Sequence, residues 1–532
     1  MEKDGGKMVN GNNNKTPRVI VLGFDAATWN IIDPLLDKGE LPNFKAMINN
    51  GVRGNLHSLE SPVSPRVWTS IVTGKTEIKH GIMDFYSNRS HLKSKRIWDI
   101  LNEKGQSCSI FYWFVTWPPQ KEIKGHMVPG FLSMDTQTVP SELSFLKELE
   151  MNEKNKIIEE QKGGGFLYEL KMAKSALRFG VKPLTLFKAI LFKITQKFKK
   201  YVELDVFAKV QLLKLYLYGD VFKYMLRNHP TDFAAILFPQ ADQIGHKYWA
   251  YYEPDRYEEK VGIHVSQSDR LKYGDVIPHI YREMDKLVGD ILKTINDDDI
   301  LMIISDHGFG MIEEPRAQLK IKNTEFFEHL GLRDVVHGFS IGPDYIIQVA
   351  DSKHQGNMEK LAKKFKNIQL EDSEESLFDV TIKGKEIILG LNNVWVMDLK
   401  DEMILLKKNL KINGKSIPVS EILAYRSDIS GDHEQIGIFL MAGKNIKQGQ
   451  TVADCSVLDI TPTFLYLKDL PIAKDMDGKP IVDAFEPGYI KQKPVSYIDT
   501  YENPQEKEEE DDLDFAVSDE LQDRLKGLGY LN

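Results

Sequence analysis

Residues 18–26 read RVIVLGFDA, and this stretch decides the fold class. Its β-branched and apolar side chains, closed by Gly23, predict a short strand that is buried on both faces, as in the interior of a parallel sheet. The strand delivers Asp25 to its carboxyl end, and open α/β sheets carry their chemistry at that edge. Asp25 is therefore the first candidate site residue.

Further apolar runs have the same character. Residues 109–114, 233–238 (FAAILF) and 300–304 (ILMII) are expected to be strands. Helical periodicity is expected between them, for example over 44–50 and 281–296. Strands that alternate with helices over several hundred residues indicate an α/β fold, with a mostly parallel central sheet flanked by helices.

Two regions interrupt this alternation. Residues 135–225 contain almost no strand signal, whereas 311–425 mixes short strands with turns such as Asn413-Gly414. Both are expected to be insertions that cap a core. The expected organisation is a disordered leader (1–15), core segments (16–134, 226–310 and 426–500), a helical cap (135–225), a second insertion (311–425), and an acidic linker with a C-terminal helix (501–532). Within this last segment 506–514 is an acidic run, and Ser518 is expected to cap the helix.

The overall composition of the chain argues against several classes of protein. The 532 residues carry a net charge of −9 and a pI of about 5.9, so the chain offers no broad basic field for a nucleic-acid polymer. No run of about 20 apolar residues predicts a membrane span, and residues 1–15 lack the apolar run of a secretory signal. The only cysteines, Cys108 and Cys455, are far apart and imply no disulfide framework. A cytoplasmic protein is expected.

Oxygen and imidazole groups recur just after predicted strands or in turns. Each of these motifs, taken alone, can be explained as a turn or as a pair of side chains on a helix surface. Together they make a mixed nitrogen and oxygen set that suits zinc, or another borderline divalent metal, better than calcium or magnesium. The set comprises Asp25, Ser64 in PVSPRVWTSIVTGK, Asp242 and His246 in ADQIGH, Asp306 and His307 in SDHG, and His433 in SGDHEQIGIF.

The order of these motifs resembles the alkaline phosphatase superfamily, specifically its type I phosphodiesterase/nucleotide pyrophosphatase branch. In that family an Asp after the first strand is followed by a nucleophile, a Thr-Gly turn and a His-Gly-Ile sequence. Ser64, Thr73-Gly74 and 80–82 keep this register, and the later D-x-x-x-H, D-H-G and G-D-H elements are also present. The resemblance covers roughly residues 16–135, 225–310 and 420–532.

Residue by residue, the resemblance implies two metal sites and a serine nucleophile. Asp242, His246 and His433 would hold one divalent ion, and Asp25, Asp306, His307 and the Ser64 oxygen would hold the other. The implied ions are zinc, with manganese or iron as alternatives. Ser64 would attack phosphorus and form a phosphoserine. The implied function is hydrolysis of phosphate diesters with nucleotide-like or lipid-head-group-like substrates.

The sequence also departs from the pattern of the superfamily that it resembles. Sulfatases of the superfamily carry Cys-x-Pro-x-Arg at the nucleophile, whereas residues 64–66 are Ser-Pro-Arg, so sulfatase activity is disfavoured. Nucleotide pyrophosphatases have Thr at the Ser64 position and a phosphate-binding Asn where Phe85 stands, which weakens the case for a nucleotide substrate. Arg66 is a candidate for gripping a phosphate oxygen, with a structural role as the alternative.

Residues 184–218 combine seven lysines with Leu, Phe, Ile and Val at helical spacing. Such a basic amphipathic helix can lie on an anionic membrane or pack its apolar face on the core. Three functions remain open: the phosphodiesterase, a phosphomonoesterase or phosphomutase with the same metal site, and a non-catalytic membrane-surface protein on a retired hydrolase fold. The sequence leaves the oligomeric state unspecified.

Overall fold

The structure is a computed structural model. It describes residues 16–60, 62–83, 85, 87–150, 166–198, 203–312, 319–332, 336–341, 344–349, 358–373, 375–383, 386–392, 405–425 and 430–503. The expected leader (1–15), the acidic run 506–514 and the helix expected after Ser518 lie outside these residues.

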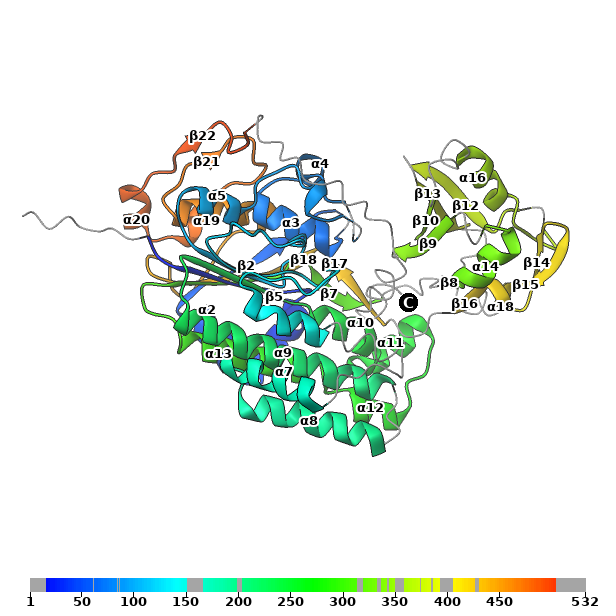
Figure 1. Cartoon of the computed structure of the whole chain (residues 1–532), viewed down its shortest axis with the longest axis horizontal. Helices are drawn as coiled ribbons and strands as arrows, with labels where there is room; N and C mark the ends of the chain where they lie inside the picture. Colours follow the sequence, from blue (N-terminus) through cyan, green and yellow to red (C-terminus); the bar gives the residue numbers. More distant parts are fainter. Residues whose placement is uncertain are drawn as a thin grey trace, which may run out of the picture.

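A nine-stranded sheet forms the centre of the fold (Figure 1). Its main path runs in the order β19-β2-β18-β6-β1-β5-β3-β4, with β20 beside β2. The five strands from β6 to β4 are parallel, and β18 is antiparallel to both of its neighbours. This arrangement confirms the expected α/β class. The strands are β1 Val19–Phe24, β2 Gly51–His57, β3 Cys108–Phe111, β4 Gly125–Val128, β5 Phe233–Phe238, β6 Ile300–Ile304, β18 Ile436–Gly443, β19 Gln450–Thr451 and β20 Cys455–Ser456.

Three of the expected strands form β1, β5 and β6, and all of their residues are buried. The strand expected over 109–114 is shorter, because β3 ends at Phe111. Tyr112 and Val115 have φ of 58° and 57°, a left-handed conformation that an extended strand cannot contain.

Helices cover both faces of the sheet. Figure 1 shows α3, α5 and α19 above it and α2, α13 and α9 below. The helix expected over 44–50 forms α2, while the helix expected over 281–296 begins and ends earlier as α13. The helices of this unit are α1 Trp29–Asp37, α2 Pro42–Asn49, α3 Ser64–Thr73, α4 Glu77–His80, α5 Ile97–Glu103, α9 Glu203–Asn228, α10 Gln240–Tyr252, α11 Pro254–Val261, α12 Gln267–Tyr273, α13 Val276–Leu292, α19 Ile460–Leu467 and α20 Pro487–Gln492.

The basic segment 184–218 is not one helix. It is divided between α8 (Pro183–Phe198) and α9, and α7 (Phe166–Arg178) precedes them. The Thr185 hydroxyl donates a hydrogen bond of 2.6 Å to Asp220 Oδ2. A continuous helix rises about 1.5 Å per residue and would hold these side chains roughly 50 Å apart. The chain therefore folds back between α8 and α9.

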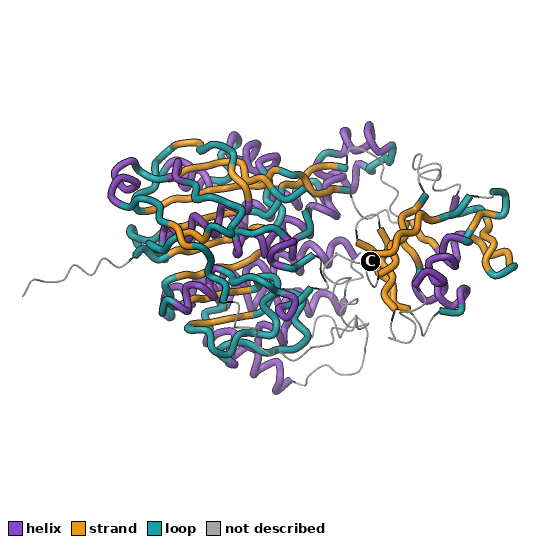
Figure 2. The backbone as a smooth tube through the Cα atoms, turned by 90° about the horizontal axis from the view of Figure 1, so that it is seen from above, coloured by secondary structure: helices purple, strands orange, loops and turns teal. Residues whose placement is uncertain are grey.

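A second unit has its own hydrophobic core, built from residues between 321 and 423. Asn413 and Gly414 both have positive φ in the turn between β14 and β15, as a tight hairpin requires. Figure 2 shows this unit apart from the main sheet. Its elements are β8 Leu319–Ile321, α14 Asn323–Leu330, β9 Val336–Ile341, β10 Asp344–Val349, α16 Met358–Lys366, β11 Gln369–Leu370, β12 Phe378–Lys383, β13 Glu386–Leu391, β14 Asn409–Ile412, β15 Lys415–Pro418, α18 Val419–Ile422 and β16 Leu423–Tyr425.

Two short strand pairs complete the main unit. They are β7 (Gly308–Met311) with β17 (Gly431–Glu434), and β21 (Ile472–Ala473) with β22 (Tyr497–Ile498). None of the helices in the described residues combines the length and the apolar composition needed to cross a bilayer.

Candidate active site

Three neighbouring strands bring their carboxyl ends together at the site. Phe24 at the end of β1 lies opposite Phe238 of β5, and Gly23 lies opposite Ile304 of β6. The chain then leads from β1 into Asp25, from β5 into α10, and from β6 into residues 305–307. The backbone also joins two of these segments, since the amide of Asp242 donates to the Asp25 carbonyl oxygen at 3.1 Å. Parallel pairing thus gathers three distant segments at one edge of the sheet.

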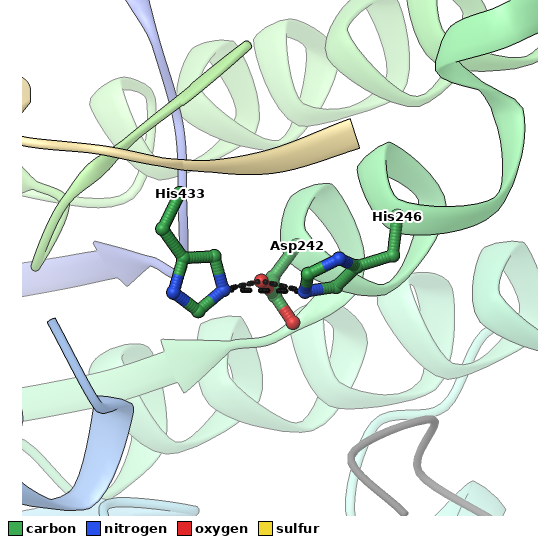
Figure 3. A group of neighbouring side chains, drawn as sticks. All are labelled: Asp242, His246 and His433. Carbon is green, nitrogen blue, oxygen red and sulfur yellow. Dashed lines mark hydrogen bonds and ion pairs between the residues drawn. The ribbon is translucent and has the colours of Figure 1, made fainter. Parts of the chain in front are cut away.

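The first cluster consists of Asp242 and His246 from α10 and His433 from β17 (Figure 3). The spacing of Asp242 and His246 places them on one face of the helix. His433 reaches them because β17 pairs with β7, which follows β6 directly. The Nε2 atoms of His246 and His433 lie 3.3 Å and 3.2 Å from Asp242 Oδ1. They lie 3.2 Å from one another.

The outer ring nitrogens of both histidines are engaged by backbone carbonyls. His246 Nδ1 lies 3.0 Å from the oxygen of Gly431, and His433 Nδ1 lies 3.1 Å from that of Pro62. Each carbonyl requires a proton on Nδ1, so in the neutral ring the Nε2 lone pair points into the cluster. Metal-ligating histidines are commonly oriented in this way. Asp242 Oδ2 is also buried and makes no hydrogen bond within the described chain. This donor set fits a divalent cation.

The second cluster is Asp25, Asp306 and His307, all fully buried. His307 Nε2 lies 3.3 Å from Asp306 Oδ2 and 3.6 Å from Asp25 Oδ1. His307 Nδ1 is 2.9 Å from the Gly308 carbonyl, which again directs Nε2 inward. Within the described residues, His307 Nε2 and Asp306 Oδ2 have no hydrogen-bond partner. Buried polar atoms are rarely left in this state, and a bound cation would satisfy both.

The two clusters adjoin one another. The rings of His307 and His433 stack with centroids 3.9 Å apart. Asp242 also raises the pKa of both Asp25 and Asp306 through its charge. The clusters are therefore coupled sterically and electrostatically.

Burial dominates the protonation of the second cluster. It raises the pKa of Asp25 well above the usual range, and the Asp306 carboxylate adds to the effect. It likewise raises the pKa of Asp306 to about 7. Burial and the nearby His433 hold the pKa of His307 well below its usual value. Two carboxyl groups that resist ionisation together are a favourable setting for a cation, which would stabilise both negative charges.

In the first cluster, Asp242 and His433 shift each other's pKa. Burial opposes protonation of His433, but the hydrogen bond and charge of Asp242 outweigh it and raise the pKa of His433 to about 9. Burial also raises the pKa of Asp242, yet the charge and hydrogen bond of His246 outweigh that and lower it overall. Metal binding here would have to displace a proton, because a histidine ligand must be neutral.

Ser64 stands at the start of α3, beside the second cluster. It is fully buried, and its hydroxyl lies 3.5 Å from Asp25 Oδ1. Val63 precedes it as the N-cap and Pro65 follows in the first turn, which suits a proline because it needs no amide donor there. The positive end of the helix dipole favours a negative oxygen or a phosphate group at this position.

Arg66 does not lie unbound at the surface. Its Nε and Nη2 atoms donate to the Met83 carbonyl oxygen at 3.0 Å and 2.9 Å. The contact ties α3 to the loop after His80. His80 itself is buried, with Nδ1 accepting from the Ile82 amide and Nε2 2.9 Å from Ser70 Oγ. The His-Gly-Ile motif thus supports the loop beside the nucleophile.

Sequence analysis did not identify Phe309 as part of the site. Its ring lies 4.8 Å from that of His246 and 5.7 Å from that of His433. A Cβ atom on Gly431 would meet the Phe309 ring at 2.4 Å, so the glycine lets β17 approach. The sequence feature that could have indicated its role is that Phe309 stands between two glycines directly after Asp306-His307.

The chain is similar to known proteins at two levels, a family model and solved structures. A family model described as "Type I phosphodiesterase / nucleotide pyrophosphatase" matches residues 19–396. No curated protein sequence matches the chain. Among solved structures, murine ectonucleotide pyrophosphatase / phosphodiesterase 5, as an inactive variant in complex with AMP, has 13% identity and a TM-score of 0.44. The human protein has 13% identity and a TM-score of 0.45. Both alignments cover 88% of this chain and 100% of the other.

Proposed function

The chain belongs to the type I phosphodiesterase / nucleotide pyrophosphatase family, and from this premise we propose that it cleaves phosphate diesters with two metal ions and the nucleophile Ser64. Family membership makes it a phosphoric ester hydrolase of the phosphodiesterase/nucleotide pyrophosphatase type. The observation that carries the finer proposal is the pair of adjoining clusters, in which Asp242 Oδ2, Asp306 Oδ2 and His307 Nε2 are buried without a hydrogen-bond partner among the described residues.

The ligands are Asp242, His246 and His433 for one ion, and Asp25, Asp306, His307 and Ser64 Oγ for the other. Divalent ions there would favour the serine alkoxide and stabilise the charge on the leaving oxygen. The mixed nitrogen and oxygen set favours zinc, with manganese or iron(II) as alternatives.

Ser64 begins the reaction. Its Oγ loses its proton and attacks phosphorus, the bond from phosphorus to the leaving oxygen breaks, and the leaving group departs as an alcohol that takes up a proton. The phosphoserine that forms still carries the other ester group. Water then cleaves the phosphoserine and returns the Ser64 hydroxyl. The first-turn position of Ser64 on α3 supports this role, because the amide groups of that turn stabilise a phosphoryl oxygen. Its 3.5 Å distance from Asp25 places the hydroxyl beside the second cluster.

The substrate is a small diester of nucleotide-like or lipid-head-group-like chemistry. A role for Arg66 in holding a phosphate oxygen is also part of this proposal. The guanidinium would have to exchange the Met83 carbonyl oxygen for the substrate. We place the activity in the cytoplasm, since Cys108 and Cys455 are both free and buried, as suits a reducing compartment.

The test is hydrolysis of bis-p-nitrophenyl phosphate beside p-nitrophenyl phosphate, using metal-stripped protein supplied again with zinc or manganese. We expect diester cleavage that requires metal, and Ser64→Ala should lower kcat by at least about a thousandfold while metal content stays near the wild-type value. Ser268→Ala, which removes an exposed hydroxyl on α12, is the matched control.

Different outcomes separate the alternatives. A preference for the monoester would move the assignment to a phosphatase or phosphomutase. Retention of more than a few per cent of activity in Ser64→Ala would remove the serine as nucleophile. Bound metal without turnover of either ester would support a retired hydrolase.

A further inference from the structure

The solvent-facing side of α8 is apolar, which reverses the usual pattern of a surface helix. Thirteen large apolar side chains are exposed among the described residues, and seven of them lie on the consecutive helices α7 and α8. Five of the seven are on α8, where each is 48–61% exposed. They are Leu184, Phe187, Ile190, Leu191 and Ile194, and α7 adds Leu170 and Leu177.

The five residues of α8 form one stripe. At 3.6 residues per turn they span an arc of about 120°. The opposite side of the helix faces the protein, where Thr185 is buried and Leu186 packs against the main core. Lys188 and Lys193 are both exposed. Lys188, whose Nζ lies 4.1 Å from the centre of the Tyr216 ring of α9, borders one edge of the stripe, and Lys193 lies just beyond Leu186 on the other side. An apolar stripe between lysines is the arrangement of helices that lie in a membrane interface.

Charge distinguishes this region from the rest of the molecule. Residues 166–198 contain seven Lys or Arg and a single acidic residue, Glu169, in a chain whose net charge is −9. Two copies joined through this face would bring like charges together. An anionic bilayer instead offers the opposite charge and an apolar interior below it. Apolar patches of this kind rarely stay exposed on a soluble monomer.

We propose that the exposed apolar face of α7 and α8 docks the protein peripherally on anionic lipid membranes. The stripe of α8 enters the head-group region, and the flanking lysines contact lipid phosphates. This proposal does not depend on the reaction that the active site performs.

The docking face is linked to the helix that carries two of the proposed metal ligands. Thr185 near the start of α8 reaches Asp220 late in α9, so the end of α8 lies toward the start of α9. There the Leu204 carbonyl accepts a hydrogen bond from the hydroxyl of Tyr248, two residues after His246 on α10. Docking through α8 therefore holds the site end of the molecule near the bilayer.

Vesicle flotation of the full chain tests the proposal, using phosphatidylcholine vesicles with and without phosphatidylglycerol. We expect flotation only with the anionic lipid and less of it at high salt. The double variants Phe187→Gln/Ile194→Gln and Lys188→Glu/Lys193→Glu should each reduce the bound fraction about tenfold. Leu271→Gln, which removes an even more exposed leucine from α12, should bind like the wild type.

Thermal melting shows whether each variant is folded, and it does so without reference to catalysis. The proposal fails if folded wild-type protein does not float with anionic vesicles, or if both double variants float as well as the wild type. It also fails if Phe187→Gln/Ile194→Gln instead abolishes a dimer seen by light scattering, which would assign the face to a second copy of the chain.

Discussion

Asp306 is a buried carboxyl group whose ionisation costs the metal-free protein stability. Its folded-state pKa of about 7 lies above the ordinary 3.8. Between about pH 4 and pH 7 the folded state therefore holds a proton that the unfolded state has lost. The stabilisation that this group provides below about pH 4 is lost as the pH rises through that range. Above about pH 7 the ionised side chain destabilises the metal-free protein by on the order of 4 kcal/mol.

Asp306→Asn should consequently stabilise the metal-free protein while removing one metal ion. The amide oxygen can still accept from the Ala26 amide, as Asp306 Oδ1 does at 3.2 Å. Thermal melts of metal-stripped protein should show a higher midpoint for the variant at about pH 8, with the difference shrinking toward pH 5. Metal analysis should show lower stoichiometry than in the wild type.

Asp99 is the matched control, because it is a largely buried carboxylate, with its side chain 14% exposed, whose pKa is shifted in the opposite direction. Burial opposes its ionisation, but Arg96 outweighs burial and lowers its pKa. Asp99→Asn should lower the midpoint at pH 8. A lower midpoint for Asp306→Asn as well would contradict the view that Asp306 is a destabilising charge.

At the scale of elements, β17 positions His433 only because it lies tightly against β7 and α10. Gly431 is the point of closest approach: a Cβ atom there would lie 2.4 Å from the Phe309 ring and 2.7 Å from the Gly245 carbonyl oxygen. Strand pairing sets the place of His433, and the two histidine–carbonyl hydrogen bonds set the ring orientations.

Gly431→Ala should therefore displace β17 and weaken metal binding at the first cluster by at least about tenfold, since ligand geometry is sensitive to small shifts. The global fold should survive, because the main sheet does not include β17. Zinc titration against a competing chelator measures the effect. Gly488→Ala provides the control, as a Cβ atom there meets nothing within 4 Å. Wild-type affinity in Gly431→Ala would show that His433 is not held by this packing.

At the scale of the whole molecule, two hydrophobic cores share one chain. The main core surrounds the nine-stranded sheet, and the second lies in residues 321–423. Every proposed ligand belongs to the main unit. The second unit supplies none, although it occupies the chain between His307 and His433.

Calorimetry should accordingly resolve two unfolding transitions. Adding zinc should raise the midpoint of the transition that belongs to the main unit, because a ligand stabilises the state that binds it. The second transition should not move. A single transition that shifts as a whole would show that the two units unfold cooperatively.

Much of the fold could be predicted from local sequence patterns. Strands that are buried on both faces must be continuously apolar. Residues 233–238 and 300–304 can therefore be recognised as strands from their own composition, without knowledge of the strands beside them. The same reasoning located Asp25 and Asp306 at the carboxyl ends of strands. Element boundaries were less accessible: β3 ends early because of a backbone conformation at Tyr112 that composition does not reveal.

By itself, the sequence determined the α/β class, the order of the motifs and the identity of the groups that could bind metal, because these depend on local periodicity and side-chain chemistry. Only the tertiary structure decided which groups meet. Asp242 and His433 are 191 residues apart in the sequence, yet the two side chains lie 3.2 Å apart because β17 returns to pair with β7. It also decided that the apolar side of α8 faces outward, because periodicity defines the two faces of a helix but only packing selects the one that is buried.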